Sequence, residues 1–305
     1  MNYLHRTLAV LTVCAAAEGV IAHSPARAEE PLPVFKTSVA VVPITAVVRD
    51  RRDRIVRDLD REDFQVRDDG QLRPIVDFRS TERGPISVGL LVDTSGSMRG
   101  PNLERGRLVV DQLLDLLNEP GDEVALFTFD KSTRQETPFT SRADVIRHAI
   151  SGTDAWGLTS LYDAIADTAK ELANRPSRGR AVIVITDGSD TSSTLSSEEV
   201  SGRASAIDVP VYVVAVVPPG YGPDGTLAEM DEELWNLAYW TGGDMRYAGA
   251  PQQSAVALGY VVSELRQQYF LAIESATSSG WRRLDVSTRR RNLTVRARSG
   301  YFAAR

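Results

Sequence analysis

The sequence predicts an α/β fold in which a doubly wound, mostly parallel sheet is inserted in a small β-sandwich. In the middle of the chain, apolar strand patterns alternate with helical patterns, which is typical of a parallel sheet covered on both faces. Toward both ends, short alternating strand patterns occur, and each set is too small to bury a core alone. We therefore expect the two end segments to pair with each other.

The composition is ordinary for a globular protein. Of the 305 residues, 42% are hydrophobic and 25% are charged, and the length is enough for one large domain or two small ones. The net charge of −6 gives no reason to expect nucleic acid or an anionic membrane as a partner. No part of the sequence is long and apolar enough to predict a membrane span.

Residues 1–28 have the pattern of a secretory signal peptide. A short basic region precedes the apolar segment Thr7–Ala17, and Ala26-Arg-Ala28 matches a small-x-small cleavage pattern. Cleavage there would make Glu29 the first mature residue, so we expect an exported protein, periplasmic or extracellular. Residues 29–37 are rich in Pro and Glu and are expected to form a linker.

Removal of this leader limits the available chemistry. Cys14 is the single cysteine and leaves with the leader, as do His5 and His23. The mature chain then has no thiol or disulfide, and the usual Cys/His zinc site is excluded. His148 remains as the one mature histidine, but it lies in an amphipathic helical pattern that favours a structural role.

Residues 38–82 are expected to form the N-terminal strands of the sandwich. Val39–Val48 is a β-rich run in which Pro43 indicates a break or an edge position. Phe64–Val76 has the pattern of a hairpin, because Asp69-Gly70 is a strong two-residue turn signal between alternating flanks.

Residues 83–268 are expected to form the inserted α/β domain, with apolar strands and amphipathic helices. The expected strands are Ile86–Val92, Glu123–Asp130, Thr133–Phe139 as an antiparallel edge, Arg180–Gly188, Val209–Val217 and Asp244–Tyr247. The expected helices are Leu103–Leu117, Ala143–Ile150, Leu161–Asn174, Ser197–Ile207, Glu229–Trp240 and Ser254–Gln268. Within the fifth of these helices, Trp235, Tyr239 and Trp240 are expected to pack in the core or on the sheet.

Residues 269–305 are expected to complete the sandwich. The predicted strands there are Tyr269–Glu274, Arg282–Ser287 and Asn292–Arg298. They alternate apolar and polar residues as the N-terminal strands do, so the two sets can share one core.

Two predicted strands of the central domain end in side chains that carry oxygen. Asp93, Ser95 and Ser97 follow one strand in the motif Asp-Thr-Ser-Gly-Ser, and Asp187 ends another. Ligands of open α/β sheets bind at the carboxyl ends of strands. Carboxylate and hydroxyl oxygens suit Mg²⁺, Mn²⁺ or Ca²⁺, so we expect a divalent metal here. The other interpretation is that these Asp and Ser side chains only cap a helix or a turn.

A third element, Thr159 at the start of a predicted helix, completes a family pattern. The Asp-x-Ser-x-Ser motif, the Thr and the second Asp, in this order, resemble the metal-ion-dependent adhesion site of the von Willebrand factor A domain. The resemblance covers roughly Ile86–Gln268. It implies a Rossmann-like, doubly wound sheet with three loops that meet at one edge.

The resemblance also implies a role for each residue of the site. Ser95, Ser97 and Thr159 would contact the metal, whereas Asp93 and Asp187 would act through bound water. A site with few direct charges keeps the cation electron-poor, so that a carboxylate from a partner can complete its coordination.

The segments that flank the domain resemble a subtype of this family. Asp60-Arg-Glu-Asp-Phe-Gln-Val-Arg-Asp-Asp-Gly70 precedes the domain, and Val295-Arg-Ala-Arg-Ser-Gly-Tyr-Phe302 follows it. Both are similar to segments of exported bacterial von Willebrand factor A proteins of the acidobacterial type. This resemblance implies an architecture more than a function.

The expected function is that of an exported, non-catalytic protein that binds an acidic side chain of a protein partner through the metal. Trp156, on the loop before Thr159, is expected to border the binding surface. One alternative is a metal-assisted hydrolase at the same site, since metal-bound water can act as a nucleophile. The other is a structural or assembly protein of the cell envelope that uses its β-sandwich.

Overall fold

The computed structural model describes residues 41–80, 84–175, 177, 179–188, 190–218 and 232–303. The expected leader and linker, residues 1–37, lie outside these ranges, as does the start of the helix expected from Glu229. Within the described ranges, no helix is long and apolar enough to cross a membrane.

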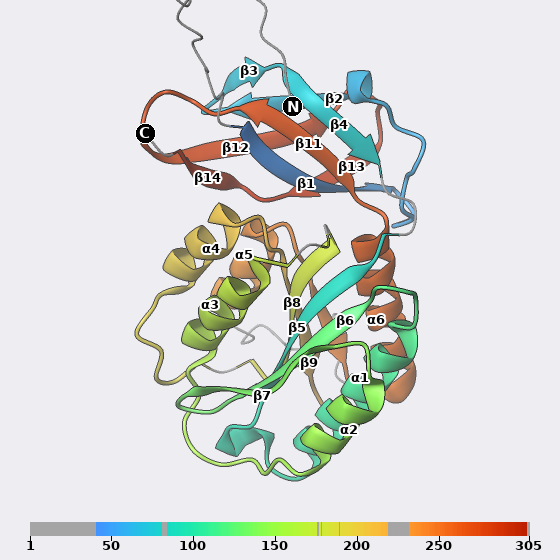
Figure 1. Cartoon of the computed structure of the whole chain (residues 1–305), viewed down its shortest axis with the longest axis vertical. Helices are drawn as coiled ribbons and strands as arrows, with labels where there is room; N and C mark the ends of the chain where they lie inside the picture. The colour runs from blue at the N-terminus through green and yellow to red at the C-terminus, as the bar shows by residue number, and fades with distance from the viewer. Residues whose placement is uncertain are drawn as a thin grey trace, which may run out of the picture. The chain divides into compact units, whose positions relative to one another are not determined.

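A mostly parallel sheet forms the centre of the α/β domain (Figure 1). Its described strands lie in the order β10-β9-β8-β5-β6-β7, and neighbours pair in parallel except for β6 and β7. The predicted fold class is therefore confirmed, and the antiparallel edge strand with it. The strands are β5 (Ile86–Asp93), β6 (Glu123–Phe129), β7 (Thr133–Thr140), β8 (Gly179–Thr186), β9 (Val211–Val216) and β10 (Met245–Ala248).

Helices cover both faces of this sheet because its central strands are apolar on both sides. Every residue of β5 is buried. Val88 and Leu90 belong to the core under α1, α2 and α6, whereas Leu91 belongs to the core under α3, α4 and α5. Figure 1 shows the two groups of helices on opposite faces. The helices are α1 (Pro101–Leu116), α2 (Ala143–Ser151), α3 (Leu161–Leu172), α4 (Ser197–Ala206), α5 (Glu232–Trp240) and α6 (Pro251–Arg266).

The two end segments of the chain pair with each other. One sheet has the order β13-β1-β11-β4, the other β14-β12-β2-β3, and one apolar core contains side chains of both. Within the first sheet, Ser80 of β4 lies opposite Tyr269 of β11. The strands are β1 (Val41–Asp50), β2 (Phe64–Asp68), β3 (Gln71–Arg73), β4 (Ile75–Ser80), β11 (Tyr269–Glu274), β12 (Gly280–Thr288), β13 (Leu293–Ala297) and β14 (Gly300–Ala303).

The N-terminal hairpin is shorter than predicted. β2 and β3 pair around the Asp69-Gly70 turn, whose residues have φ of 47° and 80°, but Pro74 ends β3 and β4 joins the other sheet. The expectation for Pro43 is confirmed. At that residue β1 pairs with β11 alone, since β13 pairs with β1 only from Ala46 onward.

The placement expected for two aromatic residues of α5 is wrong. Trp235 and Tyr239 are 47% and 50% exposed, and their rings stack on each other with centroids 5.4 Å apart. The face of α5 that meets the sheet consists of Leu234, Leu237 and Ala238. Only one face of a helix can pack on a sheet, and here the smaller residues occupy it.

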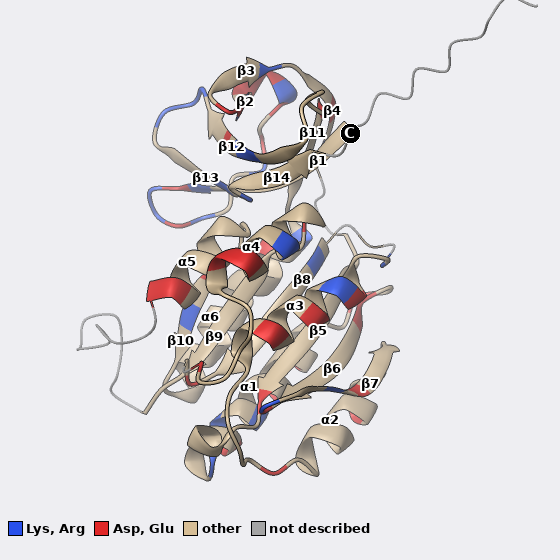
Figure 2. Cartoon of the chain, turned by 90° about the vertical axis from the view of Figure 1, so that its left-hand side faces the viewer, with Lys and Arg blue, Asp and Glu red and all other residues tan. Residues whose placement is uncertain are grey.

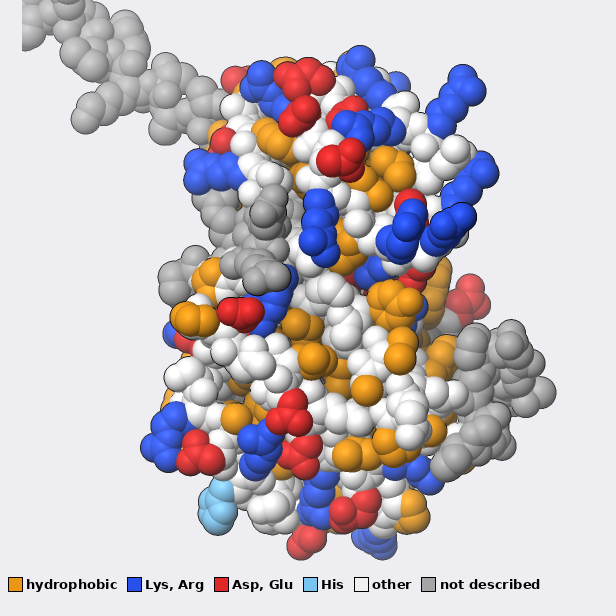
Figure 3. All heavy atoms as spheres, turned by 90° about the vertical axis from the view of Figure 1, so that its right-hand side faces the viewer, with side chains coloured by type: hydrophobic (Ala, Val, Ile, Leu, Met, Phe, Trp, Pro, Cys, Tyr) orange, Lys and Arg blue, Asp and Glu red, His pale blue; other side chains and the backbone are white. Residues whose placement is uncertain are grey.

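Buried ion pairs join the sandwich to the α/β domain. Glu264 of α6 is 1% exposed and lies between Arg49 of β1, whose Nε is 2.7 Å from Oε1, and Arg296 of β13. Near α4, Thr45 of β1 donates a hydrogen bond of 2.7 Å to Asp208. On the face shown in Figure 3, Lys and Arg side chains gather over the sandwich, in the upper half of the view. In both ion pairs of Glu264, the sandwich supplies the cation and the α/β domain supplies the anion.

Candidate metal centre

The first part of the predicted site lies where β5 ends. Asp93 and Ser95 are fully buried, whereas Ser97 is exposed. One carboxylate oxygen of Asp93 accepts a hydrogen bond of 2.8 Å from the backbone N–H of Ser95. The hydroxyl oxygens of Ser95 and Ser97 are 3.0 Å apart. The turn after β5 therefore holds the three oxygen-bearing side chains in one cluster.

The second part lies where the adjacent strand β8 ends. Ser97 Oγ donates a hydrogen bond of 3.1 Å to Asp187 Oδ1, and Thr186 Oγ1 donates one of 2.6 Å to Asp93 Oδ2. These two bonds bring the ends of β5 and β8 together across about 90 residues of sequence. Parallel neighbouring strands end at the same edge of a sheet, which is why the sequence places these residues side by side.

The third part is the loop that carries Thr159. The Gly157 carbonyl accepts a hydrogen bond of 3.1 Å from the N–H of Gly96, inside the Asp-Thr-Ser-Gly-Ser motif. The carbonyl of Thr159 accepts hydrogen bonds of 2.9 Å from Thr191 and Ser192, which follow β8. Among the described residues, the loop is thus tied to the first turn by Gly157 and to the loop after β8 by Thr159, in both cases through backbone groups. The other four predicted ligands are linked by hydrogen bonds that involve their side chains.

The charges of this cluster are unfavourable without a cation. The pKa of the Asp93 carboxyl is raised to about 6. Burial is the main cause and the nearby charge of Asp187 adds to it, whereas hydrogen bonds from Thr186 and Ser95 oppose the shift. A bound divalent cation would offset the burial of this charge.

The spacing of the oxygens fits a small, hard cation. An octahedral ion with bonds of about 2.0–2.1 Å has neighbouring ligands roughly 2.9 Å apart. The Ser95–Ser97 and Ser97–Asp187 oxygen separations of 3.0 and 3.1 Å are close to that value. In the described part of the chain, no cluster of three or more His, Cys, Asp or Glu side chains could hold a metal. A metal here would depend on the hydroxyl oxygens, and the role of the five residues as ligands stays a prediction.

The capping interpretation explains less of this geometry. Within residues 84–175, the residue before helix α1 is Gly100, which has no side chain to cap it. Ser95 precedes the short 3-10 helix Gly96–Met98, and its side chain makes no capping bond. Capping does explain Asp190, whose Oδ1 accepts the N–H of Leu161 at 2.8 Å at the start of α3.

Two residues that support the site are absent from the sequence prediction. Thr186 donates a hydrogen bond to Asp93. Asp130 follows β6; its carbonyl accepts a hydrogen bond from the Ser160 N–H, and its carboxylate pairs with Arg134 at 3.0 Å. Asp130 follows an apolar strand in the same way as Asp187, so its position was a usable signal. Nothing in the local sequence of Thr186 distinguishes it, because its bond crosses between strands.

Comparisons with known proteins agree with this fold. The family model described as von Willebrand factor type A domain matches residues 88–189. The solved structure of von Willebrand factor type A from Catenulispora acidiphila is 13% identical, with a TM-score of 0.50, over 88% of this chain and 74% of that chain. At this identity the similarity concerns the fold.

Two further solved structures align less closely. The conserved hypothetical protein BatB from Bacteroides thetaiotaomicron is 20% identical over 60% of this chain and 98% of that chain, with a TM-score of 0.48. The vWF domain of the type V pili tip protein Mfa5 from Porphyromonas gingivalis is 20% identical over 36% of this chain and 40% of that chain, with a TM-score of 0.32. No curated protein matches the chain.

Proposed function

Since residues 88–189 match the family model of the von Willebrand factor type A domain, we propose that this chain binds a protein partner through a divalent cation at the edge of its central sheet. The hydrogen bond from Ser97 Oγ to Asp187 Oδ1 is the observation that carries the proposal. It places hydroxyl and carboxylate oxygens from two strand ends at the spacing of neighbouring ligands of Mg²⁺ or Mn²⁺. Ca²⁺ prefers longer bonds and fits this spacing less closely.

The partner in this proposal presents an acidic side chain. A cation held by Ser95, Ser97, Thr159 and Asp187, with the buried Asp93 behind them, would offer a free coordination position to a carboxylate. The position of Ser97 supports this, because it is exposed at the surface while Asp93 and Ser95 are buried below it.

The surface around the site supports a binding role. Trp156 and Leu158 are 60% and 53% exposed, on either side of Gly157. The N–H of Trp156 donates a hydrogen bond of 2.8 Å to the Thr94 carbonyl, so this loop is fixed to the motif. Exposed aromatic residues on a fixed loop are frequent at protein interfaces.

We propose binding rather than catalysis. A general base needs an accessible oxygen near the reacting group. Asp93 is fully buried, and both of its carboxylate oxygens accept hydrogen bonds, so it acts as a fixed charge. The signal-peptide pattern of residues 1–28 adds the proposal that this binding occurs outside the cytoplasm.

Calorimetric titration with Mg²⁺ and Mn²⁺ tests the proposal. We expect one site in the parent protein and loss of binding in Asp93→Ala, because removal of the carboxylate removes the charge behind the hydroxyls. Asp167→Ala makes the same change of net charge on the exposed face of α3 and should bind as the parent does. Absence of metal binding in the folded parent would refute the proposal.

A pull-down from the native cell envelope tests the partner. We expect proteins that are retained in Mg²⁺, released by chelator and not retained by Asp93→Ala. A partner that stays bound to Asp93→Ala and in chelator would instead favour the β-sandwich as the interaction surface.

A further inference from the structure

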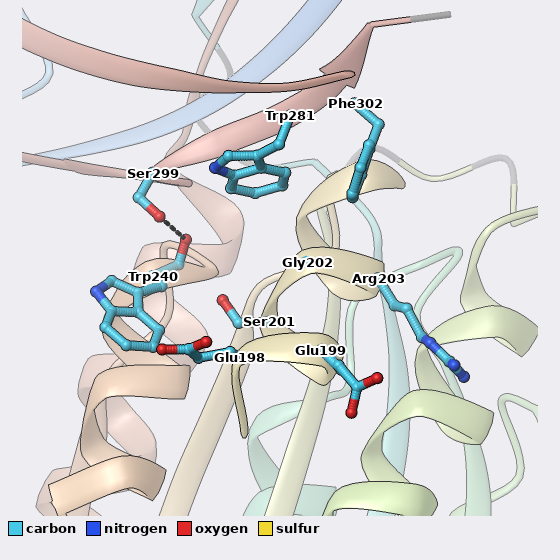
Figure 4. A pocket seen from close by; sticks show the side chains of 9 residues that line it. All are labelled: Glu198, Glu199, Ser201, Gly202, Arg203, Trp240, Trp281, Ser299 and Phe302. Carbon is cyan, nitrogen blue, oxygen red and sulfur yellow. Dashed lines mark hydrogen bonds between the residues drawn. The ribbon is translucent and has the colours of Figure 1, made fainter. Parts of the chain in front are cut away.

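A second candidate site lies where the α/β domain meets the sandwich, away from the metal centre. A cavity of about 520 Å³ opens between α4, the end of α5, and strands β12 and β14 (Figure 4). This volume is within the usual range for small-molecule sites. None of the residues that line it belongs to the three loops of the metal centre.

Aromatic rings form the walls of this cavity. Figure 4 shows Trp240, Trp281 and Phe302 around the opening, drawn on three sides of it. Trp281 and Phe302 are 45% and 59% exposed, and their rings meet edge to face with centroids 5.2 Å apart. Exposed rings that converge on one cavity leave apolar surface in water, which a ligand could cover.

Local contacts hold these rings in place. A Cβ on Gly300 would lie 2.3 Å from Cζ2 of Trp281, so the indole can occupy its position only because residue 300 is glycine. The carbonyl of Trp240 accepts hydrogen bonds of 2.8 Å from the N–H and 3.2 Å from the hydroxyl of Ser299. The backbone at Trp240 and the seat of the Trp281 indole are therefore formed without a ligand, which reduces the entropy cost of binding.

Within the ranges that the structure describes, two carboxylates, Glu198 and Glu199, and one cation, Arg203, line the cavity, and the charge of Arg203 acts on Glu199. Figure 2 shows the acidic start of α4, which carries Glu198 and Glu199. Glu199 accepts a hydrogen bond of 2.9 Å from the N–H of Ser196 and completes the cap of α4. Glu198 is exposed, and among the described residues no ion pair or hydrogen bond engages its carboxylate. In Figure 4 it is drawn on the same side of the cavity as Trp240.

We propose that this cavity binds an organic cation, an ammonium or guanidinium group on an alkyl stem. The faces of Trp and Phe rings attract cations, and an unpaired carboxylate adds a full opposite charge. The alkyl stem would cover the apolar ring surface. This site is independent of the metal centre and does not rest on the proposed function.

Titration with choline, followed by calorimetry, tests the cation. The neutral carbon isostere 3,3-dimethylbutan-1-ol has the same shape without the charge. We expect the parent protein to bind choline at least about tenfold more tightly than the alcohol, because cation–π attraction and the Glu198 charge act only on the cation. The short peptide Gly-Lys-Gly and vesicles of phosphatidylcholine then show whether a side chain or a lipid headgroup is the better source.

Two pairs of variants assign the effect to the cavity. Glu198→Gln and Trp240→Ala should each weaken choline binding roughly tenfold. Glu232→Gln removes the same charge from the start of α5, and Trp235→Ala removes an exposed ring from the same helix outside the cavity; both should bind choline as the parent does. Glu198 is exposed, so its variant remains informative if Trp240→Ala does not fold.

Four results would overturn this inference. The first is equal affinity for choline and for the alcohol, and the second is unchanged choline binding in Glu198→Gln. The third is a preference for a neutral sugar such as maltotriose, whose hydroxyls could bond Glu198 and whose ring could stack on Trp240. The fourth is absence of choline binding at millimolar concentration.

Discussion

Asp93 has the least favourable position for a charge among the five residues of the candidate metal centre. Its side chain is fully buried, and burial together with the nearby charge of Asp187 raises its pKa to about 6. Both oxygens accept hydrogen bonds, which reduces the cost of burial but does not remove it. The residue is therefore better suited to the metal-bound protein than to the metal-free one.

Replacement of Asp93 should have opposite effects with and without metal. In chelator, the native carboxyl with its pKa of about 6 binds protons more tightly than the unfolded one near 3.9, so the parent loses stability as pH rises from about 4 to above 6. Asp93→Asn removes this titration and should raise the free energy of unfolding at pH 7 by roughly 1–3 kcal/mol relative to the parent. Urea unfolding in chelator at pH 4 and pH 7 measures the free energies of unfolding of both proteins.

A matched change shows whether the effect belongs to this position. Asp167→Asn changes a residue on the exposed face of α3. The difference between its free energies of unfolding at pH 4 and pH 7 should equal that of the parent. The expectation fails if Asp93→Asn has the same stability relative to the parent at both pH values.

At the residue scale, the sequence identified the oxygen-bearing residues of the cluster better than the residues that support them. Asp93, Ser95 and Ser97 are found by a local motif, and Asp187 by its place at a strand end. Thr186 acts on Asp93 from the neighbouring strand, and sequence alone does not show which hydroxyl lies opposite which carboxylate.

At the scale of elements, the contact between β5 and α3 matters most for the site. β5 ends in Asp93, and the loop with Thr159 leads into α3. Gly89 makes this contact possible. A Cβ there would lie 2.6 Å from Cγ2 of Thr168, closer than real atoms approach. The helix and the strand can therefore lie directly against each other.

Gly89→Ala should push α3 away from the sheet. We expect a loss of about 1–3 kcal/mol in the free energy of unfolding, typical of an overpacked core, and weaker metal binding because the Thr159 loop shifts. Gly259→Ala is the matched change: it lies in α6 with no atom within 4 Å of the new Cβ and should stabilise by up to about 1 kcal/mol. Thermal unfolding compares the two, and a neutral Gly89→Ala would contradict the close packing.

Strands of the central sheet were predictable because burial on both faces makes them continuously apolar, as in β5 and β8. The face of α5 was not. Large aromatic side chains suggested that Trp235 and Tyr239 face the sheet, but the periodicity of Leu234, Leu237 and Ala238 is an equally good apolar face. When a helix has two apolar faces, its sequence alone does not show which of them packs on the sheet, because that depends on the shape of the sheet surface.

At the scale of the whole molecule, Glu264 connects the sandwich to the α/β domain. It is 1% exposed and pairs with Arg49 and Arg296 from two different strands of the sandwich. Among the described residues, Arg296 without Glu264 keeps only Asp244 as an ion-pair partner, at 3.1 Å, and Arg49 keeps only Asp53, at 3.6 Å. Both carboxylates are more exposed than Glu264, so loss of the buried partner costs more than the pair contributes.

Glu264→Gln should lower the free energy of unfolding by about 3 kcal/mol, because both guanidinium groups stay buried without that carboxylate. Asp144→Asn breaks the exposed pair with Arg142 and should have no measurable effect. Guanidinium unfolding measures both. If the two variants are equally stable, the cluster does not hold the two parts together.

The pairing of Ser80 with Tyr269 has a consequence for how the protein folds. β4 and β11 form an antiparallel pair, so the α/β domain stands where a hairpin has its turn. A turn this long is costly to close while it is unfolded, but a folded domain brings its own two ends together. The α/β domain is therefore expected to fold first and to serve as the nucleus on which the last strands of the chain find their partners from the first.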